Sequence, residues 1–375
     1  MTTIRLLKNG NEIFPAMLAT IDKAESSIAL EMYIFADDET GREFYMHLCQ
    51  AAKRGVQVMV LVDAWGSWTL TTEFWKELRM YGGMVRWFHP LFRGLLPFRN
   101  HRKLLLVDDC VAFIGGINIA NEYNNGSRGE PPWRDNALEI SGREVARLRR
   151  SFLRMWVKAD TPYRRLFHSR IGIHHEPIVL EGRLRFLESG PDNPLQPIRK
   201  AYHQLVSSAT RNIDLAMSYF YPSGRMLRAL RRAVRRGVRV RLIVPQKSDV
   251  IISGWATHGL YGRLLRAGIE VWEYEPAMMH AKIAIIDDSL VAGSANLDLR
   301  SGRINHELVV IVTDPAIVAK ARGDFENDLR SSRQIIHEQW KKRPFPQKVK
   351  ERLSYFFLVR ADMFVAKMEM MRKMR

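Results

Sequence analysis

Two histidine–lysine pairs stand at matching spacings in this 375-residue chain. Each pair belongs to a His-x-Lys-x4-Asp signature, and the two signatures consist of His101, Lys103, Asp108, His280, Lys282 and Asp287. Ordinary residue frequencies would produce one such signature on the order of 0.03 times in a chain of this length, so two are not accidental. Two histidines can divide a phosphodiester exchange between a nucleophile and a general acid, and the repeat predicts this chemistry.

The surroundings of the two lysines indicate what they bind. His101–Val107 reads HRKLLLV and His280–Ile286 reads HAKIAII, so each pair opens an apolar strand on which residues two apart share a face. A lysine there needs a compensating anion, which a phosphate held between both pairs would supply. A lone histidine on an apolar strand is more often a satisfied core residue, and lysine is also common on edge strands. The duplication favours the phosphate site over both alternatives.

The signature aspartates have a different expected role. Asp108 and Asp287 have the opposite strand parity to the histidines, so we expect them to stabilise the turns that follow and not to contact the phosphate. A glycine turn and an asparagine come next in each half, as GGIN at Gly115–Asn118 and as GSAN at Gly293–Asn296.

Each histidine needs a carboxylate that fixes its tautomer. Asp135 opens the run DNALEI and Glu307 opens the run ELVVIV, at equivalent places in the two repeats. A carboxylate at the head of an apolar strand is costly unless it is paired. We therefore expect Asp135 to pair with His101 and Glu307 to pair with His280, with Glu139 as a weaker candidate in the first half.

The two halves also share an order of elements. A buried strand is predicted at Ile28–Phe35 and again at Ile213–Phe220. Helix, glycine stop and strand then recur at Lys53–Asp63, Trp75–Phe88, Arg235–Pro245 and Tyr261–Tyr274. Each half reads as β-α-β-α-β-β, which predicts two tandem α/β domains whose sheets are flanked by helices. We place the domains at residues 1–172 and 173–345, with the boundary near Arg170–Pro177, and a basic amphipathic tail at 346–375.

Composition limits the class of partner. Hydrophobic residues make up 46% and charged residues 26% of the chain, as in ordinary folded proteins, but the net charge is +18. Such a charge predicts binding to a polyanion, either nucleic acid or an anionic membrane. The two cysteines, Cys49 and Cys110, make neither a disulfide framework nor a zinc cluster. The sequence offers no signal peptide and no run of roughly 18 apolar residues, so we expect any membrane association to be peripheral.

The paired signatures resemble the HKD motifs of the phospholipase D superfamily. The chain is most similar to bacterial cardiolipin synthases of the short type without N-terminal membrane spans, and the resemblance extends over roughly residues 5–345. The matching segments are Glu31-x-Tyr33-x-Phe35, Asp63–Ser67 (DAWGS), His101–Asn118, Ser218–Pro222 (SYFYP) and His280–Ser301. The resemblance implies two phospholipase D-like domains whose half-sites meet at a pseudo-two-fold axis.

The resemblance also implies a phosphatidyl transfer in two steps without a metal or cofactor. His101 would attack the phosphorus, and the second histidine would protonate the departing alcohol and later deprotonate the incoming one. Lys103, Lys282, Asn118, Asn296 and Ser294 would hold the phosphate oxygens. Two phosphatidylglycerol molecules would give cardiolipin and glycerol; a phospholipase D-type hydrolase, another phosphatidyltransferase and, with less support, a nuclease are the alternatives.

The implied partners are anionic phospholipids and a membrane surface, at the cytoplasmic face of the bacterial inner membrane, and not nucleic acid. The apolar loop at His89–His101 favours lipid docking, although it could also fold into the core. The arginine-rich stretch Arg225–Arg241 would suit anionic headgroups or form a solvated helix face. The tail contains apolar residues that recur near helical spacing: Leu353, Phe357, Phe364, Met368 and Met371. This stripe predicts either a helix that caps the core or a basic interfacial membrane helix.

Overall fold

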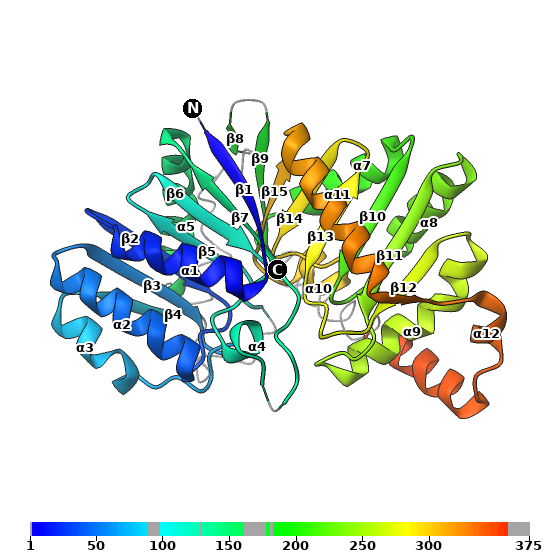
Figure 1. Cartoon of the computed structure of the whole chain (residues 1–375), viewed down its shortest axis with the longest axis horizontal. Coiled ribbons are helices and arrows are strands. Elements are labelled where there is room, and N and C mark those ends of the chain that lie inside the picture. The colour runs from blue at the N-terminus through cyan, green and yellow to red at the C-terminus, as the bar shows by residue number, and fades with distance from the viewer. Residues whose placement is uncertain (1, 89–97, 128, 161–177, 181–182, 359–375) are drawn as a thin grey trace, which may run out of the picture.

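The computed structural model describes residues 2–88, 98–127, 129–160, 178–180 and 183–358. Each half of the chain builds one mixed sheet, and the two sheets lie side by side (Figure 1). The N-terminal sheet has the strand order β1-β7-β6-β5-β2-β3-β4. The C-terminal sheet has the order β16-β12-β11-β10-β13-β14-β15-β9-β8. The expected pair of α/β domains is confirmed, while the boundary near residue 172 and the loop at 89–97 lie outside the described residues.

The N-terminal half begins with an edge strand that pairs antiparallel with the last strand of its sheet. Its strands are β1 (Thr3–Lys8), β2 (Ser27–Met32), β3 (Gln57–Asp63), β4 (Met84–Phe88), β5 (Leu104–Val107), β6 (Val111–Gly115) and β7 (Asn136–Ser141). Its helices are α1 (Asn9–Asp22), α2 (Glu39–Lys53), η1 (Glu73–Trp75), α3 (Lys76–Met80), α4 (Asn121–Asn124), η2 (Arg143–Ala146) and α5 (Arg147–Asp160).

The C-terminal half repeats this order and extends the sheet at both edges. Its strands are β8 (Ile178–Leu180), β9 (Leu184–Ser189), β10 (Asn212–Met217), β11 (Arg239–Pro245), β12 (Glu270–Tyr274), β13 (Lys282–Ile286), β14 (Ser289–Gly293), β15 (Glu307–Val312) and β16 (Ser332–Gln334). Its helices are α7 (Pro197–Ser208), α8 (Gly224–Arg235), α9 (Ile251–Arg266), α10 (Leu299–Arg303), α11 (Pro315–Arg330) and α12 (His337–Lys341).

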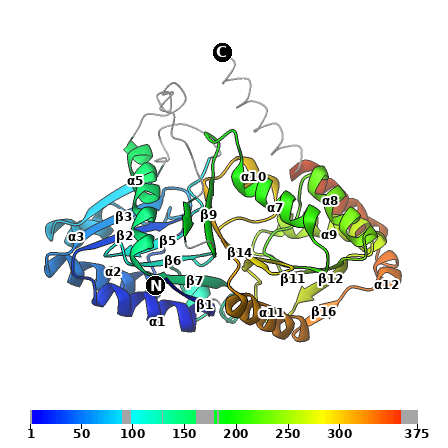
Figure 2. The same cartoon turned by 90° about the horizontal axis from the view of Figure 1, so that it is seen from above.

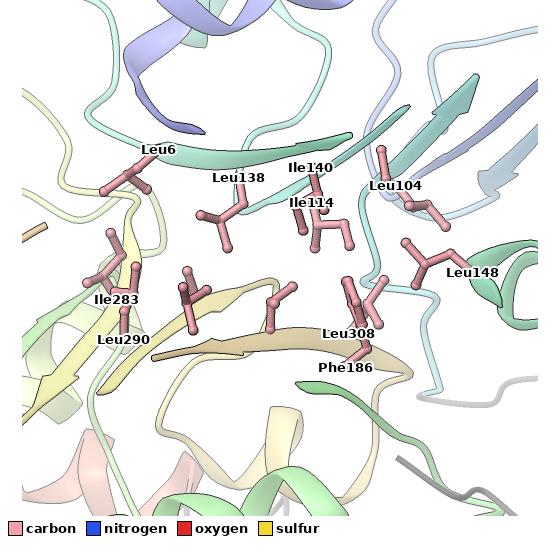
Figure 3. Packing of buried hydrophobic residues seen from close by; sticks show 14 of the residues in the cluster. Leu6, Leu104, Ile114, Leu138, Ile140, Leu148, Phe186, Ile283, Leu290 and Leu308 are labelled. Carbon is pink, nitrogen blue, oxygen red and sulfur yellow. The ribbon is translucent and has the colours of Figure 1, made fainter. Parts of the chain in front are cut away.

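The two sheets pack against each other through one shared core. Leu138 and Ile140 of the first sheet face Leu290 and Leu308 of the second, and α5 and α11 complete this layer (Figure 3). Two further cores lie on the outer faces, under α1 and α2 in one half and under α7, α8 and α9 in the other (Figure 2). Because apolar side chains alternate between both faces of each sheet, the strands are buried on both sides. The shared core therefore fixes one domain against the other.

The arginine-rich stretch is shorter as a helix than the sequence suggested. Helix α8 ends at Arg235, and Arg239 and Arg241 belong to the strand β11. Arg241 is buried and pairs with Asp214 at 2.7 Å and Glu326 at 2.6 Å. The strand position places this guanidinium between two carboxylates, so the expectation of one basic helix face up to residue 241 was wrong.

The described start of the tail forms a helix over residues 345–358 that packs on α9. Its inner face is mixed: Tyr355 and Leu358 pack against the core under α9, while Glu351 is buried and pairs with Arg343 at 2.9 Å. The Lys350 ammonium lies 3.9 Å from the centre of the Trp255 ring. Leu353 and Phe357 are exposed. Residues 359–375, with the rest of the apolar stripe, lie outside the described residues, and the function of the tail stays a prediction.

Candidate active site

The two histidines are positioned by short backbone contacts between the domains. His101 lies three residues before β5 and His280 two residues before β13, so both precede the strands on which they were expected. The His101 N–H donates to the carbonyl of His306 at 3.0 Å, and the His280 N–H donates to the carbonyl of Arg134 at 2.8 Å. Each histidine is thereby fixed beside a segment of the other domain.

Because of these contacts, the carboxylate that orients each histidine comes from the other domain. Nδ1 of His101 lies 3.1 Å from Oε2 of Glu307, and Nδ1 of His280 lies 2.6 Å from Oδ2 of Asp135. Both carboxylates are fully buried. A carboxylate accepts an N–H, so each pair places the ring proton on Nδ1 and the lone pair on Nε2. In His280 this Nε2 lies 3.1 Å from the Lys282 ammonium.

The expected pairing of Asp135 with His101 and of Glu307 with His280 was therefore wrong, although both acids serve histidines. The reason is that each acid follows a residue that hydrogen-bonds to the other domain, Arg134 in one case and His306 in the other. Glu139 is not part of the site, because it pairs with Arg5 on the neighbouring strand β1.

The residues that follow the turn glycines, Ser294 and Gly116, each lie against one of the two orienting carboxylates. The Ser294 hydroxyl donates to Glu307 and accepts the Leu308 N–H at 3.0 Å, so the structure places it on the orienting acid and not among the expected phosphate ligands. Gly116 occupies the equivalent place in the first half, where a Cβ atom would lie 2.5 Å from Oδ1 of Asp135. Only glycine leaves room for that carboxylate.

The two lysines supply a buried cationic centre. Nζ of Lys103 donates to the carbonyl of His101 at 2.7 Å, and Nζ of Lys282 donates to the carbonyl of His280 at 2.6 Å. Lys282 also contacts the hydroxyl of Ser218 at 2.9 Å. Burial, together with the charge of the second lysine, lowers the pKa of Lys103 to about 7, and burial lowers the pKa of Lys282 to about 8. Such weakened cations gain strongly from a bound phosphate.

The histidines differ in how open their rings are. Burial lowers the pKa of His101 to about 4, and its side chain is 12% exposed beside the Tyr33 ring at 4.9 Å. Burial and the Lys282 charge also lower the pKa of His280. Its side chain, 6% exposed, lies under Trp133 and Tyr123, with ring centres 5.5 and 5.2 Å away. Both imidazoles are neutral at pH 7 in the absence of substrate, and His101 is the more accessible.

The asparagines lie beside the histidines in different bonding states. Nδ2 of Asn118 donates to the Tyr123 hydroxyl at 2.7 Å, and that oxygen lies 3.3 Å from Nδ1 of His280. Oδ1 of Asn296 is buried with no hydrogen-bond partner in the described part of the chain. Asn118 thus holds the Tyr123 ring in place beside His280. The side-chain oxygen of Asn296 can accept a hydrogen bond from a ligand.

The signature aspartates lie at the turns, as parity predicted. Asp108 accepts the backbone N–H groups of Glu25, Ser26 and Ser27 at 2.8–2.9 Å, and Asp287 accepts those of three residues, Thr210 to Asn212. Partial burial acts to raise the pKa of each carboxyl, but these donors outweigh it and hold the pKa below its usual value. Both aspartates adopt positive φ angles, 50° and 46°. They stabilise the strand connections and do not contact the histidines.

Tyr123 and Trp133 were missed at the sequence level. Neither has a counterpart in the second half, where Ser301 and Asn305 occupy the equivalent distances from Asn296 and Glu307. A search for duplicated residues could not find them, and their spacing from Asn118 and Asp135 was the only signal. Within the described residues, no cluster of three His, Cys, Asp or Glu side chains is arranged to hold a metal ion. None of the described helices is both long and apolar enough to span a bilayer.

One site with two crossed His–carboxylate pairs and two buried lysines, shared by two similar domains, defines a phosphodiester-transfer protein of the phospholipase D superfamily. The description "Cardiolipin synthase, PLD-like domain" belongs to the family model that matches residues 17–156 and 202–329. The chain belongs to this family and is a phosphatidyltransferase.

Individual relatives agree with this assignment. The major cardiolipin synthase ClsA of Bacillus subtilis is 34% identical over 94% of this chain and 74% of its own length. The cardiolipin synthase of Geobacillus kaustophilus is 35% identical over 93% of this chain and 70% of its own length. Among solved structures, phosphatidylserine synthase of Haemophilus influenzae superimposes with a TM-score of 0.72 at 17% identity, covering 97% of this chain and 94% of that one. The last comparison shows the shared fold.

Proposed function

We propose that the protein is a cardiolipin synthase that transfers a phosphatidyl group from one phosphatidylglycerol to the hydroxyl of a second, releasing glycerol. The observation that carries this proposal is the pair of His–carboxylate contacts that cross between the domains. Two imidazoles, each oriented by a carboxylate of the other domain and each beside a lysine, can hold one phosphodiester and exchange its alcohol. The likeness to named cardiolipin synthases supports the choice of substrate.

In the first step, Nε2 of His101 attacks the phosphorus of the donor lipid. The P–O bond to glycerol breaks, and His280, protonated in the substrate complex, gives its proton to the leaving oxygen. The product is a phosphatidyl–histidine and free glycerol. We assign His101 as the nucleophile because its ring is the more accessible of the two and is neutral at pH 7.

In the second step, His280 removes the proton from a glycerol hydroxyl of the acceptor phosphatidylglycerol. The oxygen attacks phosphorus, the P–N bond breaks, and cardiolipin leaves with His101 restored. Lys103 and Lys282 neutralise the charge that builds on the non-bridging oxygens in both transition states, with Asn296 as a further ligand. Asp135 and Glu307 hold the ring protons on Nδ1 throughout.

The proposed partners are therefore anionic phospholipids in a membrane surface, with the protein bound peripherally at the inner membrane. The net charge of +18 supports attraction to such a surface. The same charge would attract nucleic acid, and the likeness to named cardiolipin synthases favours lipid.

The test incubates purified protein with phosphatidylglycerol that carries a label in its terminal glycerol. Labelled glycerol and cardiolipin in equal amounts are expected. Phosphatidic acid as the sole lipid product would replace the synthase by a hydrolase. Quenching in denaturant near neutral pH, which spares the acid-labile P–N bond, should trap a phosphatidyl adduct in the wild type, and an adduct in the His101→Ala protein would refute the nucleophile assignment.

A further inference from the structure

Five large apolar side chains are exposed on two segments of the molecule, one in each domain. In the first domain, Trp65 is 57% and Trp68 is 72% exposed, in the loop after β3. In the second domain, Val250, Ile251 and Ile252 are 46%, 62% and 45% exposed, at the start of α9. These five residues are called the apolar rim. Since β3 and β11 occupy equivalent places in their sheets, the segments that follow them emerge at equivalent edges.

The first part of the rim is joined to the first histidine. Oδ2 of Asp63 accepts the Asn100 N–H at 2.8 Å, and Oδ1 accepts the Trp65 N–H at 3.0 Å. The Arg99 guanidinium lies 4.8 Å from the centre of the Trp65 ring. One buried carboxylate thus holds the tryptophan loop against the residue that precedes His101.

The second part is joined to the second half-site. Asp249, directly before Val250, accepts the Tyr219 hydroxyl at 2.8 Å. Tyr219 follows Ser218, and the Ser218 hydroxyl contacts both Lys282 and the carbonyl of His280. Asp249 also acts electrostatically on Tyr33 in the other domain. Both parts of the rim therefore lie at the edge of the molecule where the two half-sites meet.

We propose that the apolar rim docks on an anionic lipid bilayer and inserts its side chains at the interface, so that lipid headgroups reach the two histidines without leaving the membrane. Tryptophan prefers the membrane interface, and the aliphatic side chains gain by leaving water. Arg99 and Arg300, which both act on Tyr33, place positive charge beside the rim and favour anionic headgroups. The inference rests on the proposed function for the identity of the lipid, because the rim lies beside the same active site.

The test measures flotation of the full-length protein with vesicles of phosphatidylglycerol and phosphatidylcholine. The Trp68→Ser/Ile251→Ser protein is expected to bind at least tenfold more weakly. The control is Met46→Ser/Met80→Ser, which removes two side chains that are 54% and 71% exposed on α2 and α3. It should bind as the wild type does. Equal binding of the rim variant and the wild type would overturn the proposal.

Two further measurements separate docking from catalysis and from self-association. Turnover of dihexanoyl phosphatidylglycerol below its micelle concentration should be unchanged in the rim variant, while turnover on vesicles falls with binding. A wild type that binds vesicles through the rim but forms no cardiolipin would leave docking intact and refute the proposed function. If light scattering without lipid shows that the rim variant dissociates a wild-type dimer, the rim is a protein interface and the docking proposal fails.

Discussion

Replacing Asp287 by asparagine should destabilise the protein without impairing its chemistry, although this residue belongs to the His-x-Lys-x4-Asp signature. Oδ1 accepts two backbone N–H groups at 2.9 Å, and Oδ2 accepts the Thr210 N–H at 2.8 Å and its hydroxyl at 3.1 Å. Asparagine tolerates the positive φ of 46°, so backbone strain does not change. The substitution instead removes the negative charge and turns one acceptor into a donor that faces an N–H.

The expected cost follows from those bonds. Hydrogen bonds to an ionised group contribute about 1.5–3 kcal/mol, and access of water at this exposed turn keeps the loss near the lower end, at about 2 kcal/mol. The melting temperature should fall by a few degrees. Because the donors hold the pKa of Asp287 below its usual value, this stabilisation is present above the unfolded-state pKa of about 4 and is lost as the pH falls through the lower folded-state pKa. The gap in melting temperature should therefore close in acid.

The neighbouring Asp288 provides a matched control. Its side chain is 84% exposed and pairs with Arg211 at the surface, so Asp288→Asn should cost less than about 1 kcal/mol. Scanning fluorimetry from pH 3 to pH 8 measures stability, and cardiolipin formation at 20 °C measures kcat. A hundredfold loss of kcat in the Asp287→Asn protein, with an unchanged melting temperature, would show that the aspartate acts in catalysis and that the structural argument is wrong.

Three other predictions concern the cleft. Asp135→Asn removes the buried acceptor of its partner histidine and should lower kcat by roughly 10²-fold or more, measured on vesicles at pH 7; a kcat within threefold of wild type would contradict the crossed pairing. The KM for phosphatidylglycerol should rise between pH 7 and pH 9, because Lys103 and Lys282, with pKa values of about 7 and 8, lose their charge; a constant KM would argue against phosphate binding by the lysines. Gly116→Ala places a Cβ atom 2.5 Å from Oδ1 of Asp135 and should lower kcat at least tenfold, whereas Gly323→Ala, whose Cβ meets no atom within 4 Å, should not; equal activities of these two proteins would refute the packing argument.

Much of the fold could be predicted from the sequence because the two halves of the chain repeat the same order of helices and strands. Buried strands such as β2 and β10 are continuous apolar runs, and glycine after a basic residue ends the helix before β3 and again before β11. Strand parity also separated the signature aspartates from the histidines correctly. These features depend on local periodicity, which a single chain segment contains.

The errors concern contacts between segments distant in the sequence. The pairing of Glu307 with His101 depends on a backbone hydrogen bond across 205 positions, between His101 and His306, which no local pattern encodes. Tyr123 and Trp133 escaped detection because the duplicated halves differ there. The buried ion pair of Arg241 with Asp214 was equally hidden, because a lone arginine in a basic stretch resembles a solvated residue.

The crossed carboxylates give a physical reason for keeping the two domains packed together. Within its own domain, either histidine would keep its lysine but lose the acid that fixes its tautomer, because Asp135 and Glu307 each serve the opposite domain. When the domains pack, each carboxylate is buried, and the histidine of the other domain supplies the partner without which that burial would be unfavourable. The backbone contacts at Arg134 and His306 therefore align the two catalytic rings and also neutralise charges that the domain interface must bury. The same residues, Arg134, Asp135, His306 and Glu307, thus align the domains and fix the protonation of the histidines.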